Sequence, residues 1–313
     1  MTYGGTGSSG PGAPPVGVPQ EAAVEAPPRP IAVAGRRPFG RWGLHIILAI
    51  ISVIWLLPTV SLLVSSFRPE AAINTTGWWN AFALPFEFTT ENYFAVLTRN
   101  NLGTSFLNSL IISIPATVIP IMIAAFAAYA FAWMNFPGRD ILFVLVVGLL
   151  VVPLQAALIP VLQLSVDVGI VGTFPAVWLA HTAFGLPFAI FLLRNFFGAM
   201  PREMFESAYI DGATPTTAFF RLAMPLAVPA IASLVIFQFM WVWNDLLVAL
   251  VLVGGFPQVA PMTVTIANLV DSLGRGWHLL TAAAFISTLL PLLVFFFLQR
   301  YFVRGILGGS VKG

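Results

Sequence analysis

Long apolar stretches alternate with short polar segments along this chain. A helix needs roughly 20 apolar residues to cross the hydrocarbon core of a bilayer, which is about 30 Å thick. Lipid offers no hydrogen-bonding partner to the backbone, so each stretch of that length is expected to be an α-helix. The pattern therefore predicts an all-α, polytopic membrane protein with six transmembrane helices. The predicted spans are residues 44–66, 108–133, 141–163, 173–197, 227–252 and 280–303.

Residues 1–40 lack this pattern and are rich in Gly, Pro, Ser and Ala. Such a segment has too little apolar surface to build a core and is predicted to be a disordered tail. The tail and the apolar stretch after it are both too long for a cleaved signal peptide. We therefore expect a tail over 1–40 and a transmembrane permease domain over 41–313.

Composition supports the membrane assignment and removes several functional classes. The 313 residues are 58% hydrophobic and 8% charged, whereas a soluble protein carries roughly 25% charged residues. The chain has no cysteine, which excludes disulfides and thiolate metal sites. Three histidines and dispersed carboxylates form no catalytic constellation, so neither an enzyme nor a cofactor or metal site is expected. Scattered basic residues and a net charge of +2 do not indicate nucleic-acid binding.

Basic residues indicate the orientation of the six spans. With the N-terminus in the cytosol, only three basic residues lie on the outer side, and the positive-inside rule favours that arrangement. An even number of spans then places both termini in the cytosol. The outer residues are Arg68, Arg99 and Arg275; the cytosolic ones are Arg29, Arg36, Arg37, Arg41, Arg139, Arg194, Arg202, Arg221, Arg300, Arg304 and Lys312.

Lys312 is the only lysine in the chain. A P-loop needs a lysine that follows a Gly-rich turn and reaches the phosphates, and Lys312 stands next to the last residue. If transport uses ATP, the ATPase is therefore a different chain.

The segment between the fourth and fifth spans predicts two short cytosolic helices. Pro201 suits the first turn of one helix, and Gly212 stops it with a left-handed turn. Thr214 is expected to cap the second helix, and Pro225 is expected to help end it before the fifth span. Such an element either lies on the membrane surface or contacts a cytosolic partner. Its acidic residues weaken the first interpretation, because membrane-surface helices are usually rich in Lys and Arg.

This segment resembles the EAA loop of ABC importer permeases, whose pattern is roughly E-A-A-x-x-D-G-A, a spacer and L-P. Ser207 replaces Ala, and Met224 replaces Leu. The residues at the positions of the pattern are Glu206, Ser207, Ala208, Asp211, Gly212, Ala213, Met224 and Pro225.

Other segments resemble the carbohydrate-importer branch of that family, and the resemblance covers nearly all of the chain outside the tail. The end of the chain is similar to that of the maltose-type (MalG-like) second permease subunit. These segments are Gly185-Leu186-Pro187-Phe188, Leu193-Arg194-Asn195-Phe196-Phe197, Trp243-Asn244-Asp245 and Gly309-Ser310-Val311-Lys312-Gly313.

The resemblance implies a MetI-like permease core with a cytosolic coupling helix, working with several partners. Glu206 through Ala213 would sit in a cleft of an ATP-binding ABC ATPase subunit, one of a dimer. The tail from Gly309 to Gly313 would contact both ATPases. Closure of the ATPases would drag the loop and turn the cavity from inward-facing to outward-facing. A MalF-like permease would complete a heterodimer, and an extracellular solute-binding protein would deliver the solute.

Four polar residues of the predicted spans are candidates for the translocation path. Asp245 is the only acidic residue well within a span, and ionisable groups at such depth suggest function. It would act with Asn244 and Gln238 on a solute, or it is a wetted or paired residue near a helix end. His181 either lines the path or satisfies a helix–helix contact.

The family resemblance indicates a di- or oligosaccharide as solute, with α-glucosides such as maltose or trehalose as examples. An ABC permease for a different solute remains the first alternative. A secondary transporter would be expected to show an internal repeat or an acid–base chain near the midplane, and neither is evident. A membrane-embedded enzyme has no candidate residues, and a purely structural subunit leaves the loop unexplained.

Overall fold

A computed structural model describes residues 1–5, 7, 38–270 and 275–310. The chain divides into two compact units, Met1–Val53 and Ile54–Gly313. Most of the predicted tail lies outside the described residues, so its disorder stays a prediction. The helix α1 (Pro38–Ser66) passes from the first unit into the second.

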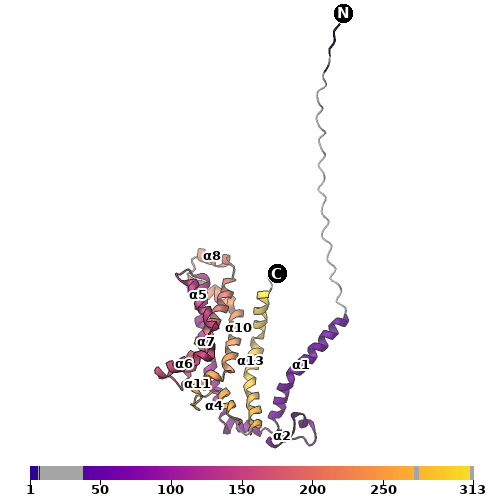
Figure 1. Ribbon diagram of the computed structural model, residues 1–313, viewed down its shortest axis with the longest axis vertical. Helices are drawn as coiled ribbons and strands as arrows, with labels where there is room; N and C mark the ends of the chain where they lie inside the picture. Colours follow the sequence, from indigo (N-terminus) through magenta and orange to yellow (C-terminus); the bar gives the residue numbers. More distant parts are fainter. Residues whose placement is uncertain (6, 8–37, 271–274, 311–313) are drawn as a thin grey trace. The chain divides into compact units, whose positions relative to one another are not determined.

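In its described residues, the regular secondary structure of the second unit is entirely helical (Figure 1). The long helices are α4 (Leu102–Trp133), α7 (Phe174–Gly198), α10 (Met224–Trp243) and α13 (Trp277–Ser310). The medium ones are α5 (Arg139–Gly148), α6 (Leu154–Asp167), α8 (Arg202–Ile210) and α11 (Leu247–Val253). Shorter turns are α2 (Glu70–Thr75), η1 (Trp78–Phe82), α3 (Glu91–Phe94), η2 (Ala95–Arg99), η3 (Leu149–Val151), α9 (Pro215–Ala218), η4 (Phe219–Ala223) and α12 (Met262–Ala267).

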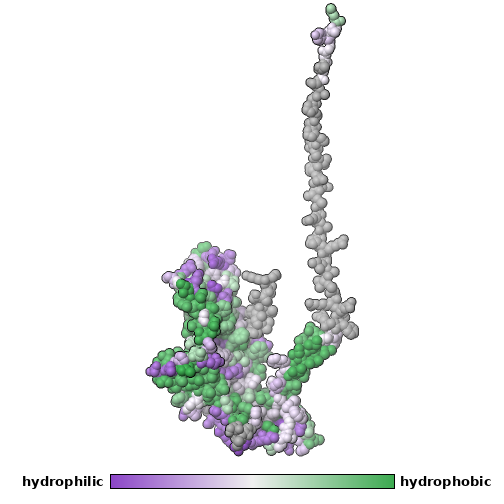
Figure 2. Space-filling view, viewed as in Figure 1, coloured by the Kyte–Doolittle hydropathy of each residue, from purple (hydrophilic) through white to green (hydrophobic). Residues whose placement is uncertain are grey.

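Among the described residues, five continuous helical stretches are long and apolar enough to cross a membrane, and each overlaps one of the six predicted spans. They are Trp42–Ser66, Leu102–Trp133, Phe174–Gly198, Pro215–Trp243 and Trp277–Phe297. Hydrophobic side chains cover much of the visible helical surface of the second unit, while hydrophilic ones gather near its ends (Figure 2). This distribution matches a protein whose middle faces lipid.

The remaining predicted span, 141–163, is not one straight helix. The stretches Arg139–Val151 and Leu154–Asp167 pass the same test only together, and they meet at an angle of 103°. Pro153 has no N–H to continue the helix, and Val152 before it is extended (φ −70°, ψ 118°). The predicted third span is therefore broken into two helices at this proline.

The core of the second unit lies where α4, α7 and α10 pack together, with α13 against α10. Small residues allow this close packing: Ala116, Ala124, Ala128 and Ala227 are all 0% exposed. Small side chains at helix contacts are typical of membrane bundles, because they bring backbones close together.

Prolines inside these helices free backbone carbonyls, and side chains of neighbouring helices bind several of them. A proline at position i removes the hydrogen bond to the carbonyl of residue i−4. Pro120 frees the carbonyl of Ala116, and Gln238 of α10 donates its Nε2–H to it at 3.1 Å. Two tryptophans act in the same way: Trp178 Nε1 donates to Ile111 O, four residues before Pro115 (2.9 Å), and Trp243 Nε1 donates to Ser287 O, four residues before Pro291 (3.1 Å).

Candidate functional site

A helical elbow lies at one end of the second unit, at the upper end of the helices around α8 in Figure 1. It consists of α8, a turn and α9, and is called the α8–α9 elbow. Gly212 ends α8 with φ +85°. Its N–H donates to Tyr209 O (3.1 Å), and the Ala213 N–H donates to Ala208 O (2.9 Å). This is the Schellman arrangement of a helix C-terminus, so the predicted glycine corner is confirmed.

The second arm of the elbow begins as expected but does not end as expected. Thr214 Oγ1 accepts a hydrogen bond from the Thr217 N–H (3.2 Å), and Pro215 takes the first helical position. The chain then continues through the π-helical η4 directly into α10. Pro225 therefore does not end the second helix, because the wider π turn accommodates a residue without an N–H at the start of α10.

Aromatic stacking attaches α8 to the helix bundle. Phe205 is 1% exposed, and its ring stacks on that of Trp133 at the end of α4, with centroids 3.8 Å apart and planes at 25°. Trp133 is in turn held by its Nε1–H, which donates to Phe197 O of α7 (3.0 Å). One buried side chain of α8 therefore contacts a residue that joins two long helices.

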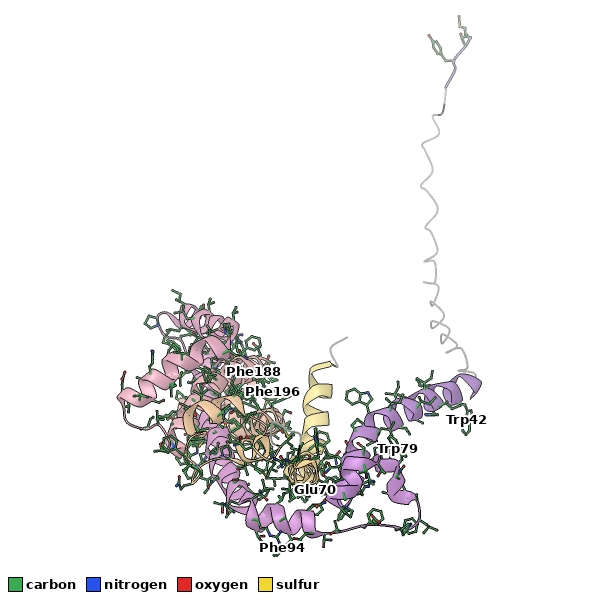
Figure 3. The ribbon with its side chains drawn as sticks, turned by 60° about the horizontal axis from the view of Figure 1, so that its bottom comes forward. Trp42, Glu70, Trp79, Phe94, Phe188 and Phe196 are labelled. Carbon is green, nitrogen blue, oxygen red and sulfur yellow. The ribbon has the colours of Figure 1, made fainter. Side chains whose placement is uncertain are left out.

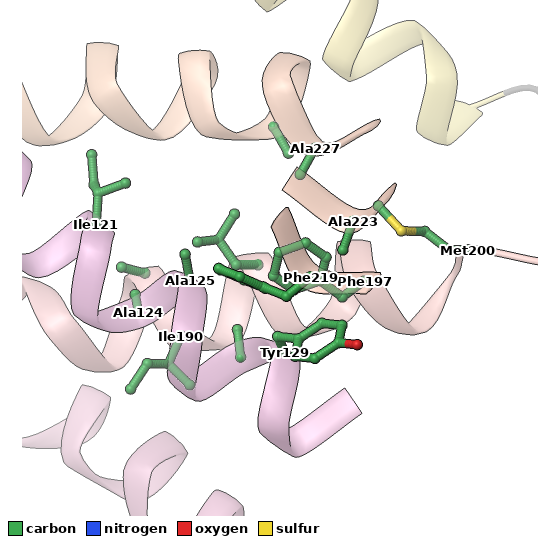
Figure 4. Packing of buried hydrophobic residues seen from close by; sticks show 14 of the residues in the cluster. Ile121, Ala124, Ala125, Tyr129, Ile190, Phe197, Met200, Phe219, Ala223 and Ala227 are labelled. Carbon is green, nitrogen blue, oxygen red and sulfur yellow. The ribbon is translucent and has the colours of Figure 1, made fainter. Parts of the chain in front are cut away.

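A second attachment comes from a pair of tyrosines. Tyr129 Oη donates to the carbonyl of Pro215 (3.1 Å) and lies 3.3 Å from Tyr209 Oη, so it contacts both arms of the elbow. The ring of Tyr129 packs edge-on against Phe197 and Phe219, as Figure 4 shows within the hydrophobic cluster beneath the elbow. The elbow is thus fixed to α4, and the same residues of α4 contact α7 and η4.

The outward face of the elbow is mainly polar and acidic. Ile210 is an exception, with 86% of its surface exposed at the end of α8. A hollow of about 440 Å³ opens beside the turn and is partly lined by Arg221. Of the motif residues, Glu206, Ser207, Asp211, Gly212 and Pro225 are exposed, and Ala208 and Ala213 are half-buried.

Most of the predicted ATPase-contacting tail lies outside the described residues. Gly309 and Ser310 are the last residues of α13, and residues 311–313 lie outside the described residues. The role of Gly309, Ser310, Val311, Lys312 and Gly313 therefore stays a prediction.

A second group of residues lies where α7 meets α10 and the break that follows α10. It is called the α7–α10 seam and consists of His181, Gly185, Gln238, Trp241 and Asp245. His181 is fully buried, and its Nε2 lies 3.5 Å from Asp245 Oδ2. Trp241 packs edge-on against the imidazole, with ring centroids 4.9 Å apart. Neither ring nitrogen of His181 makes a hydrogen bond within the described part of the chain. The sequence alone did not join these two residues.

Asp245 does not lie inside a transmembrane helix, contrary to the prediction of one span over 227–252. The helix α10 ends at Trp243, and Asp245 occupies the break before α11. Its carboxylate accepts hydrogen bonds from the N–H groups of Val248 (3.3 Å) and Ala249 (3.0 Å). Thr263 Oγ1 donates to its carbonyl (2.7 Å). The break is stable because side chains satisfy backbone groups that a continuous helix would have paired.

Gln238 and Asn244 have different surroundings. Gln238 is 4% exposed and approaches α7 at Gly185, where a Cβ would lie 2.6 Å from the amide nitrogen of Gln238. Asn244 is exposed and donates to Met240 O of its own helix (2.7 Å). The structure therefore brings His181 and Asp245 together, places Gln238 farther along the same seam, and leaves Asn244 apart.

Sequence reasoning missed the residues that hold the elbow, Tyr129 and Trp133. The two aromatic residues stand four positions apart at the end of the second span, so they share one helix face. That spacing was a usable signal, but it did not show which segment covers the face. Among the described residues, no three His, Cys, Asp or Glu side chains are placed to hold a metal ion.

Comparison with known proteins decides the family. Residues 105–308 match the family described as binding-protein-dependent transport system inner membrane component. The chain belongs to this family. The expected ABC importer permease is thereby confirmed, and the α8–α9 elbow and the α7–α10 seam both lie inside the region typical of the family.

Curated relatives of this permease cover most of its length. It is 58% identical over 272 residues to the osmoprotective compounds uptake permease protein GgtD of Synechocystis, covering 86% of this chain and 91% of that protein. It is 53% identical over 256 residues to the alpha-glucoside transport system permease protein AglG of Rhizobium meliloti, covering 80% of this chain and 67% of that protein.

A solved structure supports the permease fold. A chain of a bacterial ABC transporter that imports the acidic polysaccharide alginate matches with a TM-score of 0.73 at 22% identity. The match covers 85% of this chain and 98% of that chain. The fold expected from the sequence, an all-α ABC importer permease, is therefore confirmed.

Proposed function

We propose that this permease is the membrane subunit of an ATP-driven importer of di- or oligosaccharides, with α-glucosides such as maltose or trehalose as the favoured solutes. The relative that is 53% identical and named for alpha-glucoside transport carries this proposal. The relative that is 58% identical and named for osmoprotective compounds supports a second solute class. A single solute, such as trehalose, can belong to both classes.

The energy for transport enters through the α8–α9 elbow. Its motif residues are exposed, while Phe205 and Tyr209 on the same helix are tied to α4. A force applied to the exposed face is therefore passed to long helices rather than absorbed by a mobile loop. In this proposal, the ATPase dimer binds the face that includes Glu206 and Asp211, and its closure on ATP moves the helices.

The elbow lies on the cytosolic side of the bacterial cell membrane, and both termini lie on that side as well. The distribution of basic residues supports this orientation. Figure 1 places α8 and α2 near opposite ends of the second unit. Arg202 and Arg221 belong to the end with α8, whereas Arg68 and Arg99 flank the short helices of the other end.

Three kinds of protein partner complete the machine: an ATPase dimer, a second permease and an extracellular solute-binding protein. The lone Lys312 supports a separate ATPase, because the chain has no lysine for a P-loop. The residues Gly309 to Gly313 are proposed to contact the ATPases. The solute is proposed to pass along the α7–α10 seam, where polar groups interrupt the apolar helices.

The test is purification of the permease with its partner subunits and reconstitution into liposomes with the binding protein. ATP hydrolysis and solute uptake are measured with maltose, trehalose, sucrose and glycine betaine. Stimulation by a saccharide is expected. Stimulation by glycine betaine alone would replace the sugar assignment and keep the coupling mechanism. Solute accumulation without the ATPase subunits would instead indicate a secondary transporter.

A further inference from the structure

A small aromatic pocket opens on the α7–α10 seam. Its volume is about 290 Å³, just below the roughly 300–1,000 Å³ of typical ligand sites. Phe188 on α7, labelled in Figure 3, is 42% exposed, and Phe237 on α10 is 51% exposed. The pocket is lined by Phe184, Gly185, Phe188, Phe237, Gln238 and Trp241.

One polar side chain lies among these aromatic rings, and it carries both a donor and an acceptor. The Nε2–H of Gln238 is used by Ala116 O, which Pro120 leaves without a helical partner. Its Oε1 belongs to the same side chain, which lines the pocket. Gly185 makes this arrangement possible, since a Cβ there would lie 2.6–2.7 Å from both polar atoms of the amide.

The pocket adjoins the buried histidine and aspartate. Trp241 lines the pocket and packs edge-on against His181, whose Nε2 is 3.5 Å from Asp245 Oδ2. Ionisable and amide groups at membrane depth are found where a bundle interior or a watery cavity receives them, rather than against lipid. The polar residues therefore favour a pocket that faces the solute path over one that faces acyl chains.

Aromatic rings combined with an amide oxygen suit a sugar ring. The faces of an aromatic ring carry partial negative charge, and the axial C–H groups of a pyranose carry partial positive charge. A ring hydroxyl can donate to an amide oxygen such as Gln238 Oε1. The volume has room for one ring rather than an oligosaccharide.

We propose that this pocket is a hexose subsite through which this subunit contacts the solute during translocation, with Trp241 and Phe188 as stacking surfaces and Gln238 as hydroxyl acceptor. The proposal rests on the saccharide importer function proposed above. It assigns part of the solute path to this subunit's own residues.

The chain has no cysteine, so a Phe188→Cys variant carries one thiol in this subunit. The complete transporter is treated with a water-soluble maleimide in the presence of maltose or of mannitol, and labelling of this subunit is measured. Phe191→Cys is the control, because Phe191 lies on α7 and is 37% exposed but does not line the pocket. Labelling at position 188 is expected, with two- to tenfold slowing by maltose only. Failure of the maleimide to reach position 188, or equal rates with both solutes, would overturn the subsite.

A second measurement uses substitutions that keep the pocket apolar. Phe188→Leu and Trp241→Leu remove an aromatic face, whereas Phe191→Leu does so outside the pocket. In proteoliposomes with saturating binding protein, the first two are expected to lower maltose uptake per ATP hydrolysed by about two- to tenfold, the range expected for one lost aromatic contact. The control is expected to keep the wild-type ratio. An unchanged ratio in both pocket variants would mean that the pocket only packs helices or lipid.

These outcomes separate the subsite from the function on which it rests. If the wild-type complex imports no saccharide at all, the proposed function fails and the subsite fails with it. If the wild type imports maltose while the pocket variants match the control, only the subsite fails.

Discussion

Truncation of Phe205 to alanine is expected to uncouple ATP hydrolysis from transport. The side chain is 1% exposed, and its ring lies 3.8 Å from that of Trp133. Removing a buried phenylalanine costs about 3–5 kcal/mol in other proteins. Every 1.4 kcal/mol is about a factor of ten in an equilibrium constant, so the detached form of α8 gains more than a hundredfold in relative population.

The other contact of α8 with α4 is weaker. The helix has nine residues, and isolated helices shorter than about 12–15 residues are marginal in water. The Tyr129–Tyr209 contact (3.3 Å) supplies on the order of 1 kcal/mol. We therefore expect the ATPase subunits to move α8 without moving the long helices to which it is attached.

The assay compares solute uptake with ATP hydrolysis in proteoliposomes that contain the complete transporter. Uptake per ATP is expected to fall at least tenfold in Phe205→Ala, while the amount of permease in the membrane stays unchanged. Phe239→Ala is a matched control: Phe239 is 7% exposed and also stacks on a tryptophan, Trp243, at 5.6 Å. It lowers stability without touching the elbow. A wild-type ratio in Phe205→Ala, or an equal fall in both variants, would refute the coupling role of this contact.

Three further substitutions test single features. Gly212→Asp is expected to leave the permease in the membrane but to stop transport, because a side chain strains the backbone at φ +85° and its carboxylate joins an acidic face. Wild-type uptake would contradict this. Gly212→Asn meets the same φ without the charge and is expected to retain part of the uptake. Asp245→Ala removes the acceptor of two N–H groups of α11. The variant is expected to lose about 0.5–2 kcal/mol of stability, measured as a lower Tm that Asp245→Asn largely restores. Loss of transport with an unchanged Tm would instead favour a direct role of Asp245 in the solute path. Gln238→Leu leaves Ala116 O unpaired and is expected to destabilise the complex by about 1–3 kcal/mol, measured as a lower Tm. The control Val235→Leu changes a half-buried position of the same helix and is expected to change the Tm little.

The sequence predicted features that depend on a few neighbouring residues. The lengths of the apolar stretches follow from the thickness of the bilayer, and five of them overlap a continuous helix of spanning length in the described part of the chain. Gly212 and Thr214 shape the elbow through their own backbone and side chain, so their roles could be recognised without knowledge of the rest of the fold.

The sequence was less informative where a helix is interrupted. Pro153 and Pro225 look alike as signals, yet the first lies at a bend of 103° and the second lies within a continuous helical stretch. Asp245 looked like a charge inside a span, whereas it stabilises a break by accepting bonds from α11. Hydropathy is the same for a continuous helix and an interrupted one, so it does not separate these cases.

By itself, the sequence determined that the chain is an all-helical membrane protein, and its motif indicated a permease with a glycine-cornered elbow. Only the tertiary structure decided what each interruption and each polar side chain contacts. Trp178, Gln238 and Trp243 bind carbonyls that prolines free, and their partners lie 67, 122 and 44 positions away along the chain. The physical reason is that a proline removes a hydrogen bond locally, while its replacement comes from whichever helix packs alongside.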